Sequence, residues 1–122
     1  MPTPWIAEGH IYGVCSYGQL RCLDAATGKR VWESRAATGE GRWWNAFLVP
    51  HEGRVFIHNE QGDLILAKLS PAGYEELSRA KLVEPTRKVQ ARMTIWSHPA
   101  FAMKSVFARN DREIVRCDLS AR

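Results

Sequence analysis

Residues 22–32 read Cys22-Leu23-Asp24-Ala25-Ala26-Thr27-Gly28-Lys29-Arg30-Val31-Trp32. Asp24 can accept hydrogen bonds from the amides of a turn, and Gly28 can take a left-handed conformation without a Cβ clash. Trp32 follows with a large apolar surface and an indole N–H that needs an acceptor. The stretch therefore predicts a strand that ends near Asp24, a tight turn, and a second strand that carries Trp32 into a packed layer.

The chain repeats a β-hairpin pattern outside this stretch as well. Gly9-His10-Ile11-Tyr12 recurs 44 residues later as Gly53-Arg54-Val55-Phe56, and after a further 51 residues as Lys104-Ser105-Val106-Phe107. Each copy leads through a polar turn, at residues 16–19, 59–63 and 110–112, into a β-rich run at residues 20–24, 65–69 and 115–119. The turns contain the Gly, Asn and Asp residues that favour tight hairpins.

Three units of strands follow from this repeat, at residues 3–35, 45–83 and 97–119. An extended piece precedes each hairpin, and a fourth strand follows only in the first two units. In the second unit this strand, at residues 74–83, competes with a helix start at Ser70-Pro71; the strand is preferred because Gly73 lies 45 residues after Gly28. The hairpin runs are apolar on both faces, as in a sheet covered on both sides. The expected fold is all-β, a single partial β-propeller domain of about two and three-quarter four-stranded antiparallel blades.

Residues 22–32 resemble the tryptophan-docking repeat of the pyrroloquinoline quinone (PQQ) type β-propellers, Ala-x-Asp-x-x-x-Gly-x-x-x-Trp. The structural docking motif comprises Cys22, Asp24, Thr27, Gly28 and Trp32, with Cys22 in place of Ala. The resemblance implies that Trp32 packs onto the neighbouring blade. The second unit keeps Ala67 and Gly73 but has Leu69 and Leu77 at the Asp and Trp positions. Residues 59–63, 96–101 and 108–111 are similar to the C-terminal portion of bacterial PQQ-like repeat proteins. A fragment of a larger, periplasmic propeller is therefore expected.

The resemblance implies a scaffold or binding role more than catalysis. In the enzymes of this superfamily PQQ lies at the centre of a complete propeller, held by calcium or a lanthanide, with an acidic base and often a disulfide between adjacent cysteines. This chain has no Cys-Cys pair, and no Glu, Asn and Asp set matches that site. The same repeat forms noncatalytic scaffolds such as the lipoprotein of outer-membrane protein assembly. We therefore expect a noncatalytic scaffold with no catalytic, cofactor-binding or metal-binding residue. The alternative is a part of a PQQ-dependent quinoprotein dehydrogenase whose catalytic residues lie outside this chain.

Blade count and charge indicate the class of partner. The chain falls short of the ~4 blades that close a ring, so exposed blade faces and edges are expected to bind a protein partner or a second copy. The net charge is +4, with ten basic and four acidic residues in 79–122. Arg109, Arg112 and Arg116 are interleaved with Asp111, Glu113 and Asp118, as on a solvated sheet face, which argues against nucleic-acid binding. No apolar run has the length of a membrane span, and the first residues lack the features of a secretory signal.

The spacing of cysteine and histidine shows no metal-site pattern. Cys15, Cys22 and Cys117 are an odd number without a CxxC motif, so each is expected to be a small buried residue. A disulfide between Cys15 and Cys22 across a hairpin stays open as an alternative. Residues 13–18 lack the Gly-x-Ser/Cys-x-Gly spacing of a nucleophile elbow.

Three further motifs have two interpretations each. Residues 59–63 are typical of a hairpin turn, although a cation loop has a similar composition. Trp43 and Trp44 form either a platform for a carbohydrate or quinone or, as the burial habits of Trp favour, an anchor where the chain crosses to the next blade. His98, in Trp96-Ser97-His98-Pro99, is expected to be hydrogen-bonded at a strand end rather than to act as a ligand.

Overall fold

The computed structural model describes residues 2–120, and within them the chain is all-β and contains no helix. None of these residues therefore forms a helix of the length and apolarity needed to cross a membrane. The first sheet comprises β1 (Trp5–Ala7), β2 (His10–Val14), β3 (Leu20–Asp24) and β4 (Arg30–Ser34). The second comprises β5 (Ala46–His51), β6 (Arg54–Asn59), β7 (Asp63–Ser70) and β8 (Gly73–Lys81).

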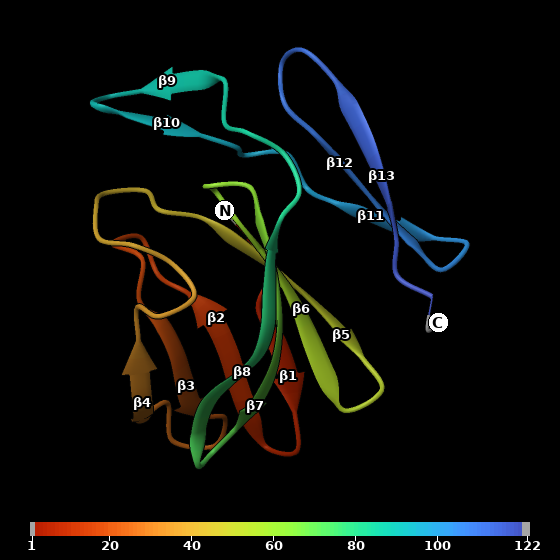
Figure 1. Cartoon of the computed structure of the whole chain (residues 1–122). Coiled ribbons are helices and arrows are strands. Elements are labelled where there is room, and N and C mark those ends of the chain that lie inside the picture. The colour runs from red at the N-terminus through yellow and green to blue at the C-terminus, as the bar shows by residue number, and fades with distance from the viewer. Residues whose placement is uncertain (1, 121–122) are drawn as a thin grey trace.

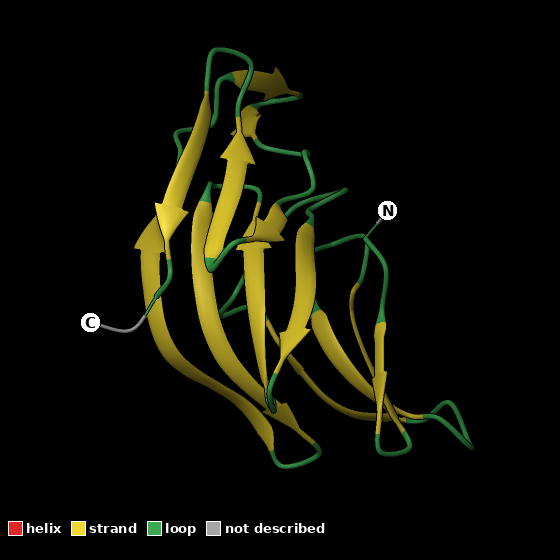
Figure 2. Cartoon of the chain, turned by 90° about the vertical axis from the view of Figure 1, so that its right-hand side faces the viewer, coloured by secondary structure: helices red, strands yellow, loops and turns green. Residues whose placement is uncertain are grey.

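The rest of the described chain forms a short hairpin and a third sheet. The hairpin comprises β9 (Arg87–Val89) and β10 (Arg92–Thr94), and the third sheet comprises β11 (Ala100–Ala102), β12 (Ser105–Arg109) and β13 (Ile114–Asp118). Every sheet is antiparallel, with its strands adjacent in chain order. Figure 2 shows that turns and loops join these strands, with no helix between them in the described part of the chain. The prediction of an all-β chain is confirmed.

Two-residue turns join the first two strands of each larger sheet. They are Glu8-Gly9, Glu52-Gly53 and Met103-Lys104, and all their φ values lie between 47° and 76°. Positive φ at both central residues is the type I′ geometry, whose twist matches that of the flanking strands. The sequence repeat therefore recurs as the same local backbone, even in the third turn, which has no glycine.

The first and second sheets pack face to face around the main apolar core. Its buried residues are Tyr12, Leu20 and Cys22 from the first sheet, Ala37 from the connection, and Ala46, Val55, Ile57, Ile65, Ala67 and Leu69 from the second. Phe47 and Phe56, which alternate with these residues, face the opposite side of the second sheet. Their rings lie 4.7 Å from the His98 ring and 5.1 Å from the Phe101 ring, respectively.

The second sheet thus lies between the first and the third, as Figure 1 shows. A smaller core joins the chain after β8 and after β10 to the third sheet; it comprises Val83, Ile95 and Ala108, with Leu82 and Val115 packed against it. Contact on both sides explains why the runs of β6 and β7 are apolar in consecutive residues.

Strand β8 decides between the two interpretations of residues 70–83. Residues 73–81 form a strand and not a helix, and the strand ends at Lys81, two residues before its expected end. Paired edge-to-edge with β7, these residues gain main-chain hydrogen bonds that a one-turn helix start at the surface lacks.

The position of a β-bulge separates Leu77 from Trp32, although the sequence aligns them. In the first sheet the register shifts after Cys22, and Trp32 lies directly opposite Cys22. In the second sheet the shift falls one residue earlier, between Leu66 and Ala67, so that Leu77 has no cross-strand partner and is exposed. Moving a bulge by one residue along the strand places the side chain that follows it on the opposite face of the sheet.

All three cysteines are free thiols. The register of β2 and β3 places Tyr12 opposite Cys22 and Val14 opposite Leu20. Cys15 follows the end of β2 and does not face Cys22, so the disulfide left open above does not form. Only Cys22 is buried; Cys15 and Cys117 are partly exposed.

Candidate functional site

The turn between β3 and β4 is held by Asp24. Its Oδ1 accepts hydrogen bonds from the amides of Ala26 and Thr27, both at 2.9 Å, and its carbonyl accepts one from the Gly28 amide at 2.8 Å. These amide hydrogen bonds favour the carboxylate and lower the pKa of Asp24. Gly28 has φ 73°, a conformation that suits a residue without Cβ.

Trp32 leaves this turn and crosses to the second sheet. Its Nε1 donates a hydrogen bond to the carbonyl oxygen of Ser70, at the end of β7, at 2.7 Å. Its ring lies 6.2 Å from the ring of Tyr12, with Cys22 opposite it in the strand pair. Burial raises the pKa of the Cys22 thiol and, with the neighbouring Cys22, raises the pKa of Tyr12 to about 12. Trp32, Tyr12 and Cys22 thus form an uncharged contact, which is one joint between the first and second sheets.

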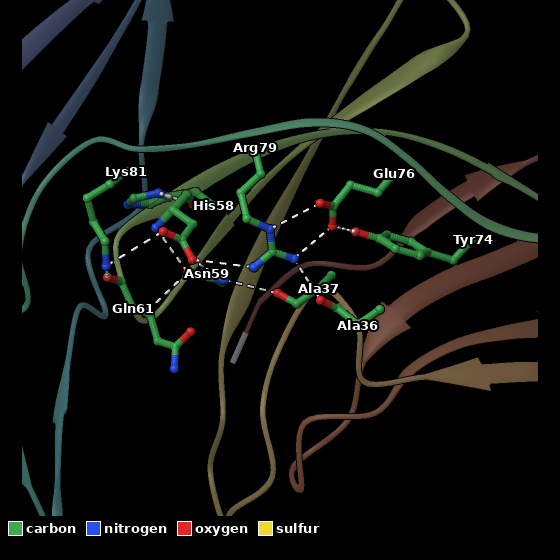
Figure 3. Close-up of polar contacts among 10 residues, drawn as sticks. Ala36, Ala37, His58, Asn59, Gln61, Tyr74, Glu76, Arg79 and Lys81 are labelled. Carbon is green, nitrogen blue, oxygen red and sulfur yellow. Dashed lines mark hydrogen bonds and ion pairs between the residues drawn. The ribbon is translucent and has the colours of Figure 1, made fainter.

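A polar network makes the second joint between the same sheets (Figure 3). Arg79 of β8 donates from Nη2 to the Ala36 carbonyl oxygen at 2.7 Å and to Glu76 Oε1 at 2.8 Å, and its Nη1 lies 3.4 Å from Asp63 Oδ2. The hydrogen bond from Arg79 lowers the pKa of Glu76. Asn59 adds a hydrogen bond from Nδ2 to the Ala37 carbonyl oxygen at 3.1 Å. The connection after β4 is thus tied to the second sheet through its backbone.

An aromatic cleft opens beyond these joints, where the ends of the two sheets meet residues 43–45 and 96. Its volume is about 320 Å³, and it is lined by Pro2, Val14, Cys15, Ser16, Trp43, Trp44, Asn45 and Trp96. Trp44 is buried, whereas Trp43 is 46% and Trp96 39% exposed. Trp43 has a positive φ of 63°, and its amide donates to the Ser16 carbonyl oxygen at 2.5 Å. The term aromatic cleft below refers to these residues.

A buried carboxylate holds the aromatic cleft in place. Glu60, in the β6–β7 turn, is 1% exposed. Its Oε1 accepts from Arg92 Nε at 2.5 Å, and its Oε2 accepts from Trp96 Nε1 at 2.8 Å and from the Asn45 amide at 3.1 Å. A buried charge is stable only when it is paired and hydrogen-bonded. Glu60 therefore ties the β6–β7 turn to two other segments, at Asn45 and at residues 92–96.

Arg92 and two glycines complete the support of Trp44. The Arg92 guanidinium lies 5.6 Å from the centre of the Trp44 ring and donates to the Arg42 carbonyl oxygen at 2.8 Å. A Cβ at Gly39 would overlap the six-membered part of the Trp44 ring, and one at Gly18 would overlap the Gly39 carbonyl oxygen. The chain can wrap Trp44 this closely only because these two positions have no side chain.

The two neighbouring tryptophans differ in burial: Trp44 is buried, as the anchor interpretation predicts, whereas Trp43 is 46% exposed. Trp96 is bound to Glu60, and Cys15 lines the same cleft. Residues 59–63 form a hairpin turn in which Asn59 Oδ1 accepts from the amides of Gln61 and Asp63, each at 3.1 Å.

His98 and His58 each have a ring nitrogen within hydrogen-bond distance of a main-chain carbonyl oxygen. His98 Nδ1 lies 2.7 Å from the Pro99 carbonyl oxygen, just before β11. His58 is buried, with Nδ1 3.1 Å from the Asp63 carbonyl oxygen, and burial lowers its pKa. Within residues 2–120 no three His, Cys, Asp or Glu side chains lie where they could hold a metal ion together.

Sequence reasoning missed Glu60, Arg92 and the β9–β10 hairpin. Glu60 lies in a stretch whose composition is typical of an exposed turn, and its partner Arg92 is 32 residues away. The hairpin strands have three residues each, which is too short for a periodicity. The local pattern of these residues gave no indication of their contacts.

No family model matches the chain, and no curated protein matches it. The function of the aromatic cleft is therefore inferred from the geometry of its residues. That geometry offers two partly exposed indole rings, Trp43 and Trp96, with the Arg42 guanidinium 4.8 Å from the centre of the Trp43 ring.

Proposed function

We propose that the chain is a noncatalytic binding scaffold of the propeller type, whose aromatic cleft receives apolar side chains of a protein partner. The observation that carries this proposal is the pair of exposed indoles, Trp43 and Trp96. Trp96 is held by a hydrogen bond to the buried Glu60, and the main chain of Trp43 is held by the Ser16 carbonyl oxygen. Tryptophan is enriched among the residues that dominate protein interfaces. A rigid, preformed aromatic surface also loses little conformational entropy on binding.

The size of the aromatic cleft favours a side chain over a cofactor. Its volume of about 320 Å³ lies at the lower limit of small-molecule sites, which are ~300–1,000 Å³. It suits one or two apolar side chains of a partner, with Trp43 and Trp96 covering them. Ser16, which carries a hydroxyl, and Cys15, which carries a thiol, line the cleft, but within residues 2–120 its lining includes no His, Asp, Glu or Lys that could act as their base.

The propeller assignment is supported by the recurrence of one unit. Three sheets share the same strand order and the same type I′ turn between their first two strands. Trp32 connects the first sheet to the second by a hydrogen bond, as the resemblance to tryptophan-docking repeats implies. We propose that the three sheets are successive blades, and that the third one, with three strands, offers the outer edge of β13 to a partner or a second copy. Ile114 on that strand is largely exposed, which suits an edge that pairs.

Selection from a random peptide library on the immobilised protein tests the binding function. We expect enriched peptides with an apolar or aromatic residue, and at least tenfold weaker binding to Trp43→Ala. Ile6→Ala is the matched control, because Ile6 is also exposed and apolar but lies outside the cleft. Peptides that bind wild type, Trp43→Ala and Ile6→Ala equally would contradict the assignment of the cleft.

A further inference from the structure

A second cavity lies at the opposite end of β5 from the aromatic cleft. It occupies about 550 Å³ between the second and third sheets, within the range of ~300–1,000 Å³ found for small-molecule sites. Its apolar wall includes Val49, Pro50, Phe56, Phe101 and Leu119. The rings of Phe56 and Phe101 lie 5.1 Å apart. We call this space the inter-sheet cavity.

The turn at the mouth of the inter-sheet cavity departs from the repeat. Met103 and Lys104 both line the cavity, with φ values of 52° and 55°. The equivalent turns of the other sheets have glycine at the second position, Gly9 and Gly53, where a positive φ costs little. Met103 is 74% exposed. The third unit thus places an apolar side chain and a cation where the fold alone favours a small or polar residue.

Lys104 brings a positive charge to the wall of the inter-sheet cavity. Lys104 forms no ion pair within residues 2–120. The other charged group on the wall, His51 when protonated, has Glu52 at 3.7 Å.

Two more charged residues, Arg116 and Asp118, lie next to the wall and hydrogen-bond to serines that line it. Arg116 Nε donates to Ser105 Oγ at 3.0 Å, and Asp118 Oδ1 accepts from the amide and the hydroxyl of Ser120 at 2.8 and 2.6 Å. The inter-sheet cavity therefore combines an apolar interior with a lysine at its mouth that forms no ion pair within the described residues.

We propose that the inter-sheet cavity binds a single amphiphilic carboxylate with a linear apolar chain, of the medium-chain fatty acid class. The chain lies along Phe56 and Phe101, where it removes apolar surface from water. The carboxylate lies at Lys104, where an ammonium group and a carboxylate form a charge-assisted hydrogen bond. Met103 covers the entrance, because its flexible thioether side chain adapts to irregular apolar surfaces.

Isothermal titration with decanoate, below the concentration at which it forms micelles, tests this site. We expect saturable binding of one decanoate per chain, weakened roughly tenfold in Lys104→Gln and unchanged in Lys88→Gln, a control with an exposed lysine on β9. Decan-1-ol, which has the chain without the charge, is expected to bind wild type and Lys104→Gln equally. Absence of saturation, or equal losses in the two lysine variants, overturns the proposal.

Lys104→Gly separates the loss of a ligand group from a loss of fold. Glycine restores the residue that the equivalent turns use, so we expect a higher midpoint of thermal unfolding together with weaker decanoate binding. A lower midpoint would contradict the strain assigned to this turn, and unchanged decanoate affinity would contradict the role of the cation. Trp43→Ala should bind decanoate like wild type, so this proposal and the peptide-binding function succeed or fail independently.

Discussion

Replacing Trp32 tests the joint between the first two sheets. Trp32→Ala removes an indole ring that packs against the main core and a hydrogen bond of 2.7 Å to the Ser70 carbonyl oxygen. Truncation of a buried aromatic side chain to Ala costs ~3–5 kcal/mol, and a neutral hydrogen bond contributes ~1 kcal/mol of net stability. Because Trp32 keeps part of its surface in solvent, we expect a loss near the lower end, about 3 kcal/mol.

Two further variants divide this loss into its parts. Trp32→Phe keeps an aromatic ring but has no N–H, so we expect it to lose only about 1 kcal/mol. Trp43→Ala removes an indole that is 46% exposed and should cost less than ~1 kcal/mol. The order of the three variants matters more than their absolute values.

Urea unfolding of wild type and the three variants, followed by circular dichroism, measures these differences. A constant slope against denaturant would show that the variants change stability and not the extent of unfolding. Equal losses in Trp32→Ala and Trp43→Ala would refute the assignment of Trp32 as the residue that joins the sheets.

Three other outcomes are expected. Glu60→Gln leaves Arg92 without its carboxylate, so we expect a loss of up to ~3–5 kcal/mol in urea unfolding and increased solvent quenching of tryptophan fluorescence. Burial lowers the pKa of His58, and the charge of His98 acts in the same direction, whereas Asp63 acts to raise it. The stability that neutral His58 contributes is complete above the unfolded-state pKa of ~6.5, and it is lost as pH falls toward the folded-state pKa. The free energy of unfolding should therefore decrease as pH falls below about 6.5, with a smaller slope in His58→Gln but not in the exposed control His51→Gln. Addition of PQQ and calcium should leave absorbance and thermal stability unchanged, and tight stoichiometric binding would instead favour the dehydrogenase alternative.

The strands and turns could be predicted because their causes are local. Gly9, Gly53 and Gly28 occupy positive φ values, and the sequence requires only a few neighbouring residues to indicate those turns. The apolar runs around Val55 and Ile65 predicted a sheet covered on both faces, and the second sheet has partners on both sides. Periodicity and turn chemistry act over the same short distances in the chain as in the fold.

The aromatic cleft could not be predicted because its causes are nonlocal. The sequence around Glu60 is typical of an exposed turn, and its side-chain partners Arg92 and Trp96 lie 32 and 36 residues later. The bulge that exposes Leu77 moves by a single residue between the first two sheets. Neither event leaves a periodicity or a spacing in the sequence, since each is decided by packing between elements.

Two departures from the repeat lie at the two cavities. Residues that recur, such as Val55 and Val106, are buried. The departures at the cavities are Arg92, in the inserted hairpin, and the Met103-Lys104 turn. The first supports the aromatic cleft and the second lines the inter-sheet cavity. A chain that only stacked its sheets would be more stable with glycine at residue 104. The retained strain therefore points to a role for that turn outside the fold.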